Sequence, residues 1–474
     1  MKIALVFEQF FLKNCGKKSN FTVKSKVLPI KGYEPEKIFL ISKKVKVMSS
    51  PKEFYETLLA KSKNAKRRIT IASLYLGTGQ MERTLVESIR SNIIQHGESL
   101  RVKILLDATR GSRGKVNSRK ILLPLFLENK RRSKVSLYHT PSLRGILHWS
   151  MPERWNEVIG LQHMKVYLFD NSVIISGANL SEDYFTNRQD RYVLLEDCEE
   201  LADFYDDLVE IVSTFSFQLD SDDQTAFLSK QSRKEKILKF PSKGRDLFAI
   251  YIEIISSLSE PTVSDTWIFP LVQMSTFSIN QDSRFTTRLF ESVPRDSKVK
   301  LASGYFNLTE EYIDTIIDRS PASFEILTAH PEANGFLRAS GPAGGIPAAY
   351  THIASKFLEK VAGKAQDFRI KLREFRRQGW TFHTKGLWVF RPGNTLPFLT
   401  LVGSPNFGYR SVYRDLESQI AVITTNQDLQ SSLSEEAENL YRDSQLATKE
   451  TYEQRERYVP LWVRGVVGVV KHYF

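Results

Sequence analysis

The chain has 474 residues, of which 41% are hydrophobic and 26% charged, so it is globular and too long for one ordinary core. Lys and Arg exceed Asp and Glu by 67 − 54 = 13, so we expect an anionic partner: nucleic acid, phospholipid or a phosphorylated metabolite. The two cysteines, Cys15 and Cys198, form no CxxC pattern, which argues against a disulfide framework or a thiolate metal site.

Residues 1–49 form a basic N-terminal segment, which we interpret as a solvated arm or as the remnant of an organelle-targeting segment. The first predicted helix begins at Ser50, because Ser50, Pro51 and Glu53 together form a capping sequence. The chain has no run of about twenty apolar residues, so we expect no membrane-spanning helix.

Strands are predicted at 68–75, 101–107 and 134–140, with helices between them at 80–96 and near 119–130. This βαβ order predicts a largely parallel sheet covered by helices. The second strand leads into a loop that contains Arg110 and Arg113 among small residues. Ligands bind at the carboxyl ends of strands in open α/β sheets, so this loop is either a phosphate clamp or a solvated basic loop.

A basic pair, His163 and Lys165, opens the next predicted strand. Because apolar residues alternate with them, the two side chains share one face of the strand. Asp170 follows, then Asn179 in the sequence Ser-Gly-Ala-Asn, and then Asp190. Taken alone, the pair would indicate no more than an edge strand with two basic side chains.

The second half of the chain repeats the first. The sequence Ala-Ser-x-Tyr occurs at 72–75 and again at 302–305, each time in a predicted strand that a helix follows. Residues 221–245 are polar and charged and form the predicted boundary. We therefore expect one domain at 50–220 and another at 246–474.

A second His-x-Lys pair, His383 and Lys385, lies in the second half. Asn406 follows in the sequence Gly-Ser-Pro-Asn, which also contains Ser404, and Glu417 comes next. The asparagine and the acid are eleven positions apart in both halves. Chance repetition of this order at matched spacing is hard to obtain, so the pattern indicates a functional site.

Two further segments of the second half have a distinct composition. Residues 331–349 contain four Gly and three Pro, which favours a loop or a lid. The tail at 459–474 is apolar but too short to span a bilayer. It either lies on a membrane surface or packs on the domain.

These residue types suit phosphodiester exchange. Imidazole acts as nucleophile or proton donor near neutral pH, so His163 and His383 supply both roles without a metal or another cofactor. The two lysines neutralise phosphoryl oxygens, and the two asparagines donate to them. Asp190 and Glu417 can each accept a hydrogen bond from a ring N–H and so hold the tautomer. The predicted substrate-binding residues are Arg110, Arg113 and Ser404.

The duplicated pattern resembles that of the phospholipase D superfamily. The first motif has His163, Lys165 and Asp170, whereas Phe390 stands at the position of Asp170 in the second. The resemblance covers both halves and implies an α/β fold of two tandem α/β/α domains related by a pseudo-twofold axis, whose motifs form one site. Because only the first motif is complete, we expect His163 to be the nucleophile.

Within this superfamily, the sequences IASLYLGTG, LLDATRGSRG and FHTKGLW resemble the enzymes that make phosphatidylglycerophosphate in mitochondria. This resemblance runs from about Ser50 to the C-terminus. It implies transfer of the phosphatidyl group of CDP-diacylglycerol to glycerol 3-phosphate through a phosphohistidine, in the pathway to cardiolipin. It also implies a peripheral protein on the matrix side of the inner mitochondrial membrane, with no nucleic-acid partner.

Three alternatives stay open from the sequence. The nearest is CDP-diacylglycerol–serine phosphatidyltransferase, which competition between serine and glycerol 3-phosphate distinguishes. A phospholipase D-like phosphodiesterase is the hydrolytic alternative, although no series of basic and aromatic residues for stacking bases is evident. A basic membrane-binding scaffold without activity is disfavoured because both His-x-Lys pairs are present.

Overall fold

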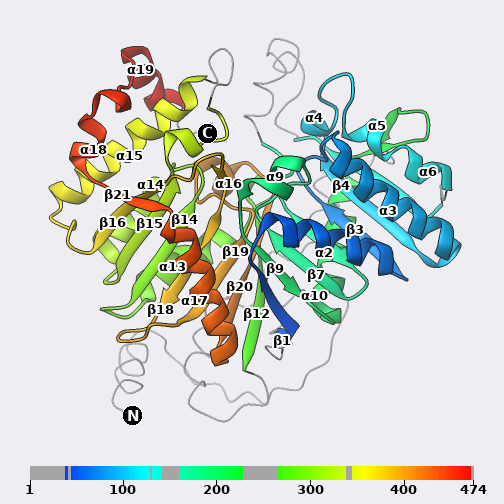
Figure 1. Cartoon of the computed structure of the whole chain (residues 1–474), viewed down its shortest axis with the longest axis horizontal. Helices are drawn as coiled ribbons and strands as arrows, with labels where there is room; N and C mark the ends of the chain where they lie inside the picture. The colour runs from blue at the N-terminus through cyan, green and yellow to red at the C-terminus, as the bar shows by residue number, and fades with distance from the viewer. Residues whose placement is uncertain are drawn as a thin grey trace.

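The computed structural model describes residues 38–40, 44–128, 131–140, 160–227, 265–337 and 344–470. Within them the chain forms two large sheets, each built mainly from one half, that lie side by side (Figure 1). The segment before residue 38, most of the predicted boundary at 221–245 and part of the predicted loop at 331–349 lie outside the described residues. The limits 50–220 and 246–474 therefore stay a prediction.

The first sheet has the strand order β11-β10-β5-β4-β3-β6-β7-β9-β2. Its strands are β2 (Val45–Met48), β3 (Arg68–Ala72), β4 (Arg101–Asp107), β5 (Ser133–Tyr138), β6 (Val166–Phe169), β7 (Ser172–Ser176), β9 (Tyr192–Leu195), β10 (Phe217–Leu219) and β11 (Thr225–Phe227). Among the neighbouring strands described in this sheet, only β3–β4 and β4–β5 are parallel pairs, and the others are antiparallel. The prediction of a largely parallel sheet is therefore wrong. Strands β6 and β7, which follow β5 in the chain, form a hairpin. Their connecting turn has only two residues, Asp170 and Asn171, and so short a turn can join only antiparallel strands.

The second sheet has the order β1-β12-β20-β19-β18-β14-β15-β16-β21, with β13 paired to β12. Its strands are β1 (Ile38–Leu40), β12 (Thr266–Met274), β13 (Ile279–Asn280), β14 (Lys298–Ser303), β15 (Ser323–Ala329), β16 (Ile370–Phe375), β18 (Lys385–Phe390), β19 (Pro397–Gly403), β20 (Glu417–Thr424) and β21 (Ser444–Ala447). Here β14, β15 and β16 are parallel, as β3, β4 and β5 are in the first sheet. The repeat seen in the sequence is thus a repeat of topology. A separate parallel pair joins β8 (Arg188–Gln189) to β17 (Thr381–Phe382).

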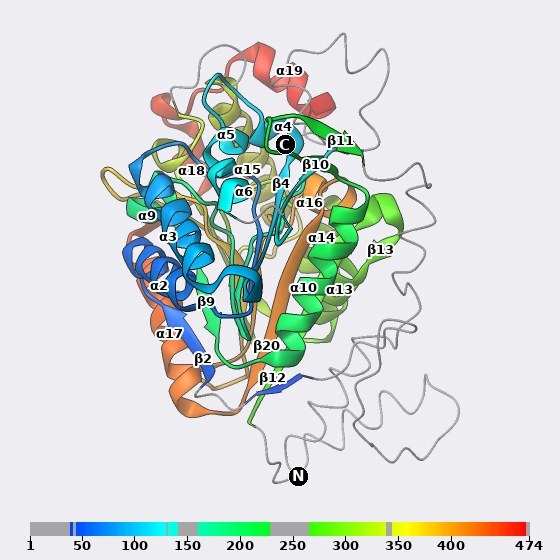
Figure 2. The ribbon, with the colours of Figure 1, turned by 90° about the vertical axis from the view of Figure 1, so that its right-hand side faces the viewer.

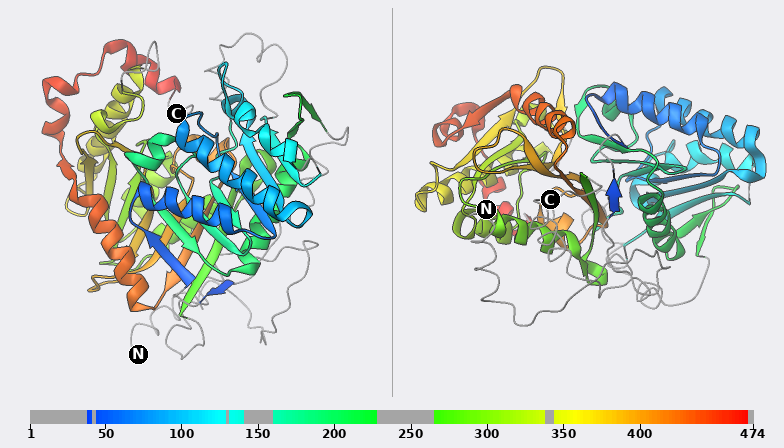
Figure 3. Two further views of the ribbon diagram at one scale, coloured as in Figure 1. Left: turned by 45° about the vertical axis from the view of Figure 1, so that its right-hand side comes forward. Right: turned by 90° about the horizontal axis from the view of Figure 1, so that it is seen from below.

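Helices cover both faces of each sheet (Figure 3). The long ones are α2 (Pro51–Asn64), α3 (Gln80–His96), α10 (Glu199–Thr214), α13 (Gln281–Ser292), α15 (Ile346–Gly363) and α17 (Gln427–Arg442). Ser50 caps α2 as predicted, because its side chain accepts from the Glu53 N–H at 3.2 Å. The helix expected near 119–130 is divided into α5 (Ser118–Leu122) and α6 (Pro124–Glu128), since Pro124 begins a new helix.

One hydrophobic cluster joins the two halves. Helix α10 of the first half and α17 of the second contribute buried side chains to it, together with β6, β7, β19 and β20. Tyr205 on α10 and Ser418 on β20 place their hydroxyl oxygens 3.2 Å apart within this cluster. The two halves therefore share a core, and neither sheet buries its inner face without the other.

The C-terminal helices lie at one end of the molecule. Helix α19 (Leu461–Val470) buries Val463 and Val467 against Ala349 of α15. It lies at the same end as α4 (Ala108–Gly111), which follows the carboxyl end of β4 (Figure 2). Among the described helices, none is both long enough and apolar enough to cross a membrane.

Candidate active site

Each predicted histidine lies on a segment that pairs with the other half. Just before β6, the backbone N–H of His163 donates to the Leu416 carbonyl at 2.9 Å. Just before β18, the N–H of His383 donates to the Gln189 carbonyl at 2.9 Å, next to the β8–β17 pair. These exchanged pairings bring together one set of side chains, called the site below: His163, Lys165, Asn179, Asp190, His383, Lys385, Asn406 and Glu417.

Glu417 orients His163. The Nδ1 of His163 lies 2.9 Å from Oε1 and 3.0 Å from Oε2 of Glu417. Glu417 is fully buried and also accepts from the Ser411 hydroxyl at 2.8 Å. The carboxylate accepts the ring N–H, which leaves Nε2 as the basic atom. Burial, and then the charge of Lys165, holds the pKa of His163 well below its usual value, which favours the neutral ring.

Asp190 orients His383 in the same way. Its Oδ2 lies 2.7 Å from Nδ1 of His383, and its Oδ1 accepts the Arg191 N–H at 2.9 Å. Burial raises the pKa of Asp190 to about 6, and burial followed by Lys385 lowers the pKa of His383 well below its usual value. Each histidine is thus held by the acid of the other repeat. Sequence order alone did not indicate this exchange.

The two lysines are buried, and each lies beside the histidine of its own motif. Lys165 Nζ donates to the His163 carbonyl at 2.6 Å, and Lys385 Nζ lies 2.5 Å from His383 Nδ1 and 3.5 Å from Asp190 Oδ2. Burial lowers the pKa of Lys385 to about 8 and that of Lys165 well below its usual value. Gly177 makes room for this arrangement, because a Cβ there would lie 2.5 Å from Asp190 Oδ1 and 2.8 Å from Lys385 Cδ.

The two motif asparagines are also in the site. Asn179 Nδ2 donates to the Tyr184 hydroxyl at 3.0 Å, and the N–H of Asn406 donates to Ser411 Oγ at 3.0 Å. In both asparagines Oδ1 is buried and accepts no hydrogen bond from a described residue. A buried amide oxygen without a hydrogen-bond donor lowers the stability of the folded protein. A substrate hydroxyl could donate to it, or the side-chain amide could rotate to exchange its oxygen and nitrogen.

Asp170 is not part of the site, which corrects the sequence prediction. It lies in the turn after β6, at the opposite end of that strand from Lys165. Its carboxylate accepts the backbone N–H groups of residues 66–68 at 2.8 to 3.1 Å. Four strand residues span about 13 Å, so the carboxylate is far from His163. Asp170 thus holds the start of β3 by accepting these backbone hydrogen bonds. Phe390 stands at the matching position of the second repeat, and its side chain cannot accept hydrogen bonds of this kind.

Ser404 supports β20 and is not placed to bind substrate. It is fully buried, its hydroxyl donates to the Ser418 carbonyl at 3.1 Å, and its Oγ accepts the Ser418 N–H at 3.1 Å. These bonds hold the start of the strand that carries Glu417. The predicted substrate-binding role of Ser404 is therefore corrected to a supporting one.

The loop after β4 brings Arg110 towards the site. Its guanidinium lies over the Tyr75 ring, 4.7 Å from the centroid. Burial raises the pKa of Tyr305, and the positive charges of Arg188 and Arg110 partly oppose this rise. Arg113 lies in the same loop, where its N–H donates to the Arg110 carbonyl at 3.5 Å. The substrate-binding roles of Arg110 and Arg113 stay predictions.

Sequence reasoning missed the residues that surround the histidines. The rings of Tyr184 and Tyr305 stand edge-on to the His383 ring at centroid distances of 5.0 and 5.6 Å. The repeated Ala-Ser-x-Tyr sequence could have indicated Tyr305, because it ends a strand at the carboxyl edge of the sheet. Asp107 was missed as well: its two carboxylate oxygens accept the N–H groups of Arg110 at 3.0 Å and Gln162 at 3.1 Å.

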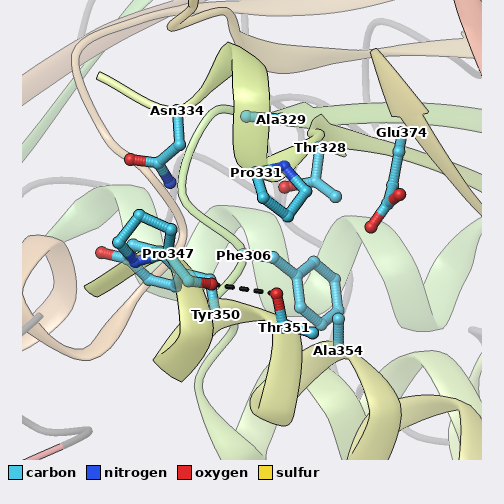
Figure 4. A pocket seen from close by; sticks show the side chains of 10 residues that line it. All are labelled: Phe306, Thr328, Ala329, Pro331, Asn334, Pro347, Tyr350, Thr351, Ala354 and Glu374. Carbon is cyan, nitrogen blue, oxygen red and sulfur yellow. Dashed lines mark hydrogen bonds between the residues drawn. The ribbon is translucent and has the colours of Figure 1, made fainter. Parts of the chain in front are cut away.

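A pocket adjoins this aromatic group (Figure 4). Tyr350 lines it and stacks on Tyr305 at 5.6 Å. Asn334 and Pro347, which both belong to the predicted loop or lid at 331–349, line the pocket as well. Two aromatic rings, those of Tyr350 and Tyr305, therefore connect the pocket to His383.

Three buried groups near the first histidine have the composition of a metal site. The ligand atoms of His163, Asp415 and Glu417 lie within 4.8 Å of one another. Asp415, however, pairs with Arg410 at 3.1 Å and accepts the Leu161 N–H at 2.9 Å, while Glu417 accepts from His163. Protein donors already occupy these oxygens, so the group is satisfied without an ion.

Known proteins similar to the chain identify its family. No family model matches the chain. A mouse protein named mitochondrial CDP-diacylglycerol–glycerol-3-phosphate 3-phosphatidyltransferase is 47% identical over 464 residues, which cover 91% of this chain and 84% of the mouse protein. The chain belongs to the CDP-diacylglycerol–glycerol-3-phosphate 3-phosphatidyltransferase family. A chicken member of this phosphatidyltransferase family is 46% identical over 469 residues, covering 91% of this chain and 84% of its own length.

A solved structure shares the fold of this phosphatidyltransferase. The phosphatidylserine synthase of Haemophilus influenzae Rd KW20 has a TM-score of 0.68 at 19% identity, covering 92% of this chain and 97% of the synthase. This likeness shows the fold alone. It confirms the predicted class: an α/β protein whose two halves each carry a large sheet.

Proposed function

We propose that the protein transfers the phosphatidyl group of CDP-diacylglycerol to glycerol 3-phosphate and releases CMP and phosphatidylglycerophosphate. The mouse and chicken relatives are named for these two substrates. The observation that carries the proposal is the meeting of His163 and His383 in one site, each paired with the acid of the other repeat. Two such imidazoles supply a nucleophile and a proton carrier.

In the first half-reaction, Nε2 of His163 attacks the phosphorus that carries the diacylglycerol. A P–N bond forms, the P–O bond to CMP breaks, and His383 gives its proton to the leaving phosphate. The negative charge of the bound donor raises the pKa of this buried ring and so favours its protonated form for this step. Because Asp170 lies outside the site, the complete first motif gives no reason to choose His163 over His383. What supports His163 now is that its Nε2 makes no hydrogen bond to a described residue, whereas Nε2 of His383 lies 3.2 Å from the Tyr184 hydroxyl.

In the second half-reaction, neutral His383 accepts the proton of the primary hydroxyl of glycerol 3-phosphate. The hydroxyl oxygen attacks the phosphorus, a P–O bond forms, and the P–N bond to His163 breaks. His383 is then protonated again for the next donor molecule. Lys165 and Lys385 donate to the non-bridging oxygens, and the anionic substrates favour the protonated forms of these buried groups.

We also infer that the protein works on the matrix side of the inner mitochondrial membrane, as a peripheral protein. The relatives are named mitochondrial, and the diacylglycerol chains of the proposed donor belong in a bilayer. Leu461 and Trp462 of α19 are 74% and 57% exposed, at the end of the molecule where α4 lies. Exposed apolar side chains on a short helix suit the bilayer interface.

Release of CMP from labelled CDP-diacylglycerol in mixed micelles tests the function. With glycerol 3-phosphate, we expect CMP and phosphatidylglycerophosphate in equal amounts. Equal CMP release without acceptor, together with phosphatidic acid, would show a phosphodiesterase instead. Serine that replaces glycerol 3-phosphate as acceptor would show a serine phosphatidyltransferase.

A further inference from the structure

Two ion pairs occupy equivalent positions in the two repeats, with their charges reversed. Counted from the motif asparagine, position four is Asp183 in the first repeat and Arg410 in the second, and position nine is Arg188 and Asp415. Arg188 Nη2 lies 3.1 Å from Asp183 Oδ2, and Arg410 Nη2 lies 3.1 Å from Asp415 Oδ2. The site thus has an arginine at position nine on the His383 side and a carboxylate on the His163 side.

Arg188 is fixed beside His383 by several contacts. Its Nε donates to Thr381 Oγ1 at 3.0 Å, and its guanidinium lies over the Tyr184 ring, 4.7 Å from the centroid. The hydroxyl of Tyr184 in turn lies 3.2 Å from His383 Nε2. The Asp183 side chain is 63% exposed, so solvent screens that ion pair and leaves much of the charge of Arg188 effective towards an anion.

Gly335 leaves space beside this guanidinium. A Cβ at Gly335 would lie 3.3 Å from the Tyr305 hydroxyl oxygen and 3.5 Å from Arg188 Nη2. The loop holds its place there because the Phe336 ring packs on the Tyr305 ring at 5.5 Å. A guanidinium and a phenol hydroxyl therefore face a position that carries no side chain. We call Arg188, Tyr305 and Gly335 the cradle.

We propose that the cradle binds the phosphate group of the acceptor, glycerol 3-phosphate. This inference rests on the proposed function. A phosphate monoester carries about two negative charges near neutral pH, and an arginine fork with a hydroxyl donor matches its oxygens. The cradle lies beside His383, the proposed base for the acceptor hydroxyl. On the His163 side, the equivalent residue is Asp415, whose carboxylate has no donor to offer a phosphate and is already paired with Arg410.

The test measures transfer and an acceptor-independent exchange in the same full-length variants. Exchange of labelled CMP into CDP-diacylglycerol needs only the first half-reaction and its reversal. For Arg188→Gln, we expect KM for glycerol 3-phosphate to rise at least tenfold, the size of a lost charged hydrogen bond, while CMP exchange falls less than threefold. Gly335→Ala, which fills the cradle, should raise the same KM, because it crowds the ligand.

Matched variants separate binding from a structural role. Asp183→Asn removes the ion-pair partner of Arg188, and Gly363→Ala alters a helix-end glycine with nothing within 4 Å of its Cβ. Both should keep KM for glycerol 3-phosphate within twofold of the wild type. Arg188→Lys should restore part of the affinity, because it keeps the charge without the fork.

The outcomes distinguish this proposal from the proposed function. An unchanged acceptor KM in both Arg188→Gln and Gly335→Ala overturns the cradle, and so does a parallel loss of exchange and transfer. A raised KM for CDP-diacylglycerol alone would assign the cradle to the donor pyrophosphate, which also overturns the proposal. Wild-type protein that exchanges CMP but does not use glycerol 3-phosphate contradicts the proposed function instead.

Discussion

Arg191 and Glu436 form a buried ion pair between the two repeats, with Nε to Oε1 at 2.9 Å and Nη2 to Oε2 at 2.7 Å. Arg191 also lies over the Trp388 ring at 3.9 Å and donates to the Leu401 carbonyl at 2.7 Å. Because Arg191 directly follows Asp190, these contacts fix the acid that orients His383.

We predict that Glu436→Gln lowers the free energy of unfolding by about 3–5 kcal/mol, because it leaves Arg191 buried without its counter-charge. Urea denaturation at constant pH measures this loss. The double variant Arg191→Met/Glu436→Leu should regain much of it, since no unpaired charge is left in the core. A single variant as stable as the wild type would mean that solvent reaches Arg191.

Replacing Asp170 should affect stability and not chemistry. Asp170→Ala removes the acceptor of three backbone N–H groups at 2.8 to 3.1 Å, so we expect a loss of about 1–3 kcal/mol in unfolding free energy. The kcat for phosphatidyl transfer, measured well below the melting temperature, should stay within about threefold. A loss of kcat as large as that in Asp190→Asn would return Asp170 to the active site.

Both histidines should be essential. His163→Ala and His383→Ala each remove one of two roles that no other side chain of the site supplies, so we expect transfer to fall at least about a thousandfold in each. Circular dichroism should show both variants folded. Near-normal turnover in either one would rule out a single shared site.

The nucleophile can be identified by trapping. With CDP-diacylglycerol labelled on the phosphorus next to diacylglycerol and no acceptor present, we expect the label on His163 after rapid acid-free quenching and peptide mapping. Asp190→Asn, which leaves His163 intact, should still take up label, though more slowly. Label found on His383 would reverse the two assignments.

The pH dependence of transfer should have two limbs. Burial raises the pKa of Asp190 to about 6, so below that pH the acid is protonated and its neutral carboxyl group stabilises a charged His383 ring far less. Burial lowers the pKa of Lys385 to about 8, so above that pH its charge on the phosphoryl oxygens is lost. We expect kcat/KM to fall below about pH 6 and above about pH 8. A profile that stays flat through pH 10 would argue against a charged Lys385 in catalysis.

Membrane contact predicts a role for two exposed residues of α19. Leu461→Ser/Trp462→Ser should reduce binding to liposomes at least tenfold, because the variant no longer buries two apolar side chains in the bilayer. Transfer in detergent micelles should stay within about twofold of the wild type, because it does not depend on binding to a bilayer. Flotation of vesicles that contain anionic phospholipid measures the binding. Replacing Leu446, which is 47% exposed on β21, gives a matched control.

The composition of the site could be predicted from sequence because the repeat preserves order and spacing. His163, His383 and the two acids all lie where the duplicated pattern indicated one site. The exchange of acids could not be predicted, because it depends on backbone pairing between distant segments, such as β8 with β17. Asp170 was assigned wrongly for a related reason: order along a motif does not report that a strand carries the last residue about 13 Å from the first.

The fold was predictable to a similar degree. Helix α3 and strand β4 begin and end as expected, because their caps and apolar patterns are local. The direction of β6, β7 and β9 was not, since hairpins and crossovers give the same apolar runs. Arg188 and Arg410 were overlooked because neither belongs to the repeated pattern. Their roles become visible only when the ion pairs at equivalent positions of the two repeats are compared.

The reversed ion pairs bear on how such a site can arise. Identical subunits around a twofold axis must place the same residue at equivalent positions, so a dimer of one repeat would have two arginines or two aspartates at position nine. Two repeats within one chain are free of this constraint, and here Arg188 and Asp415 differ at equivalent positions. With the cradle as the proposed acceptor site, this asymmetry lets two similar histidines treat a lipid donor and a water-soluble acceptor differently.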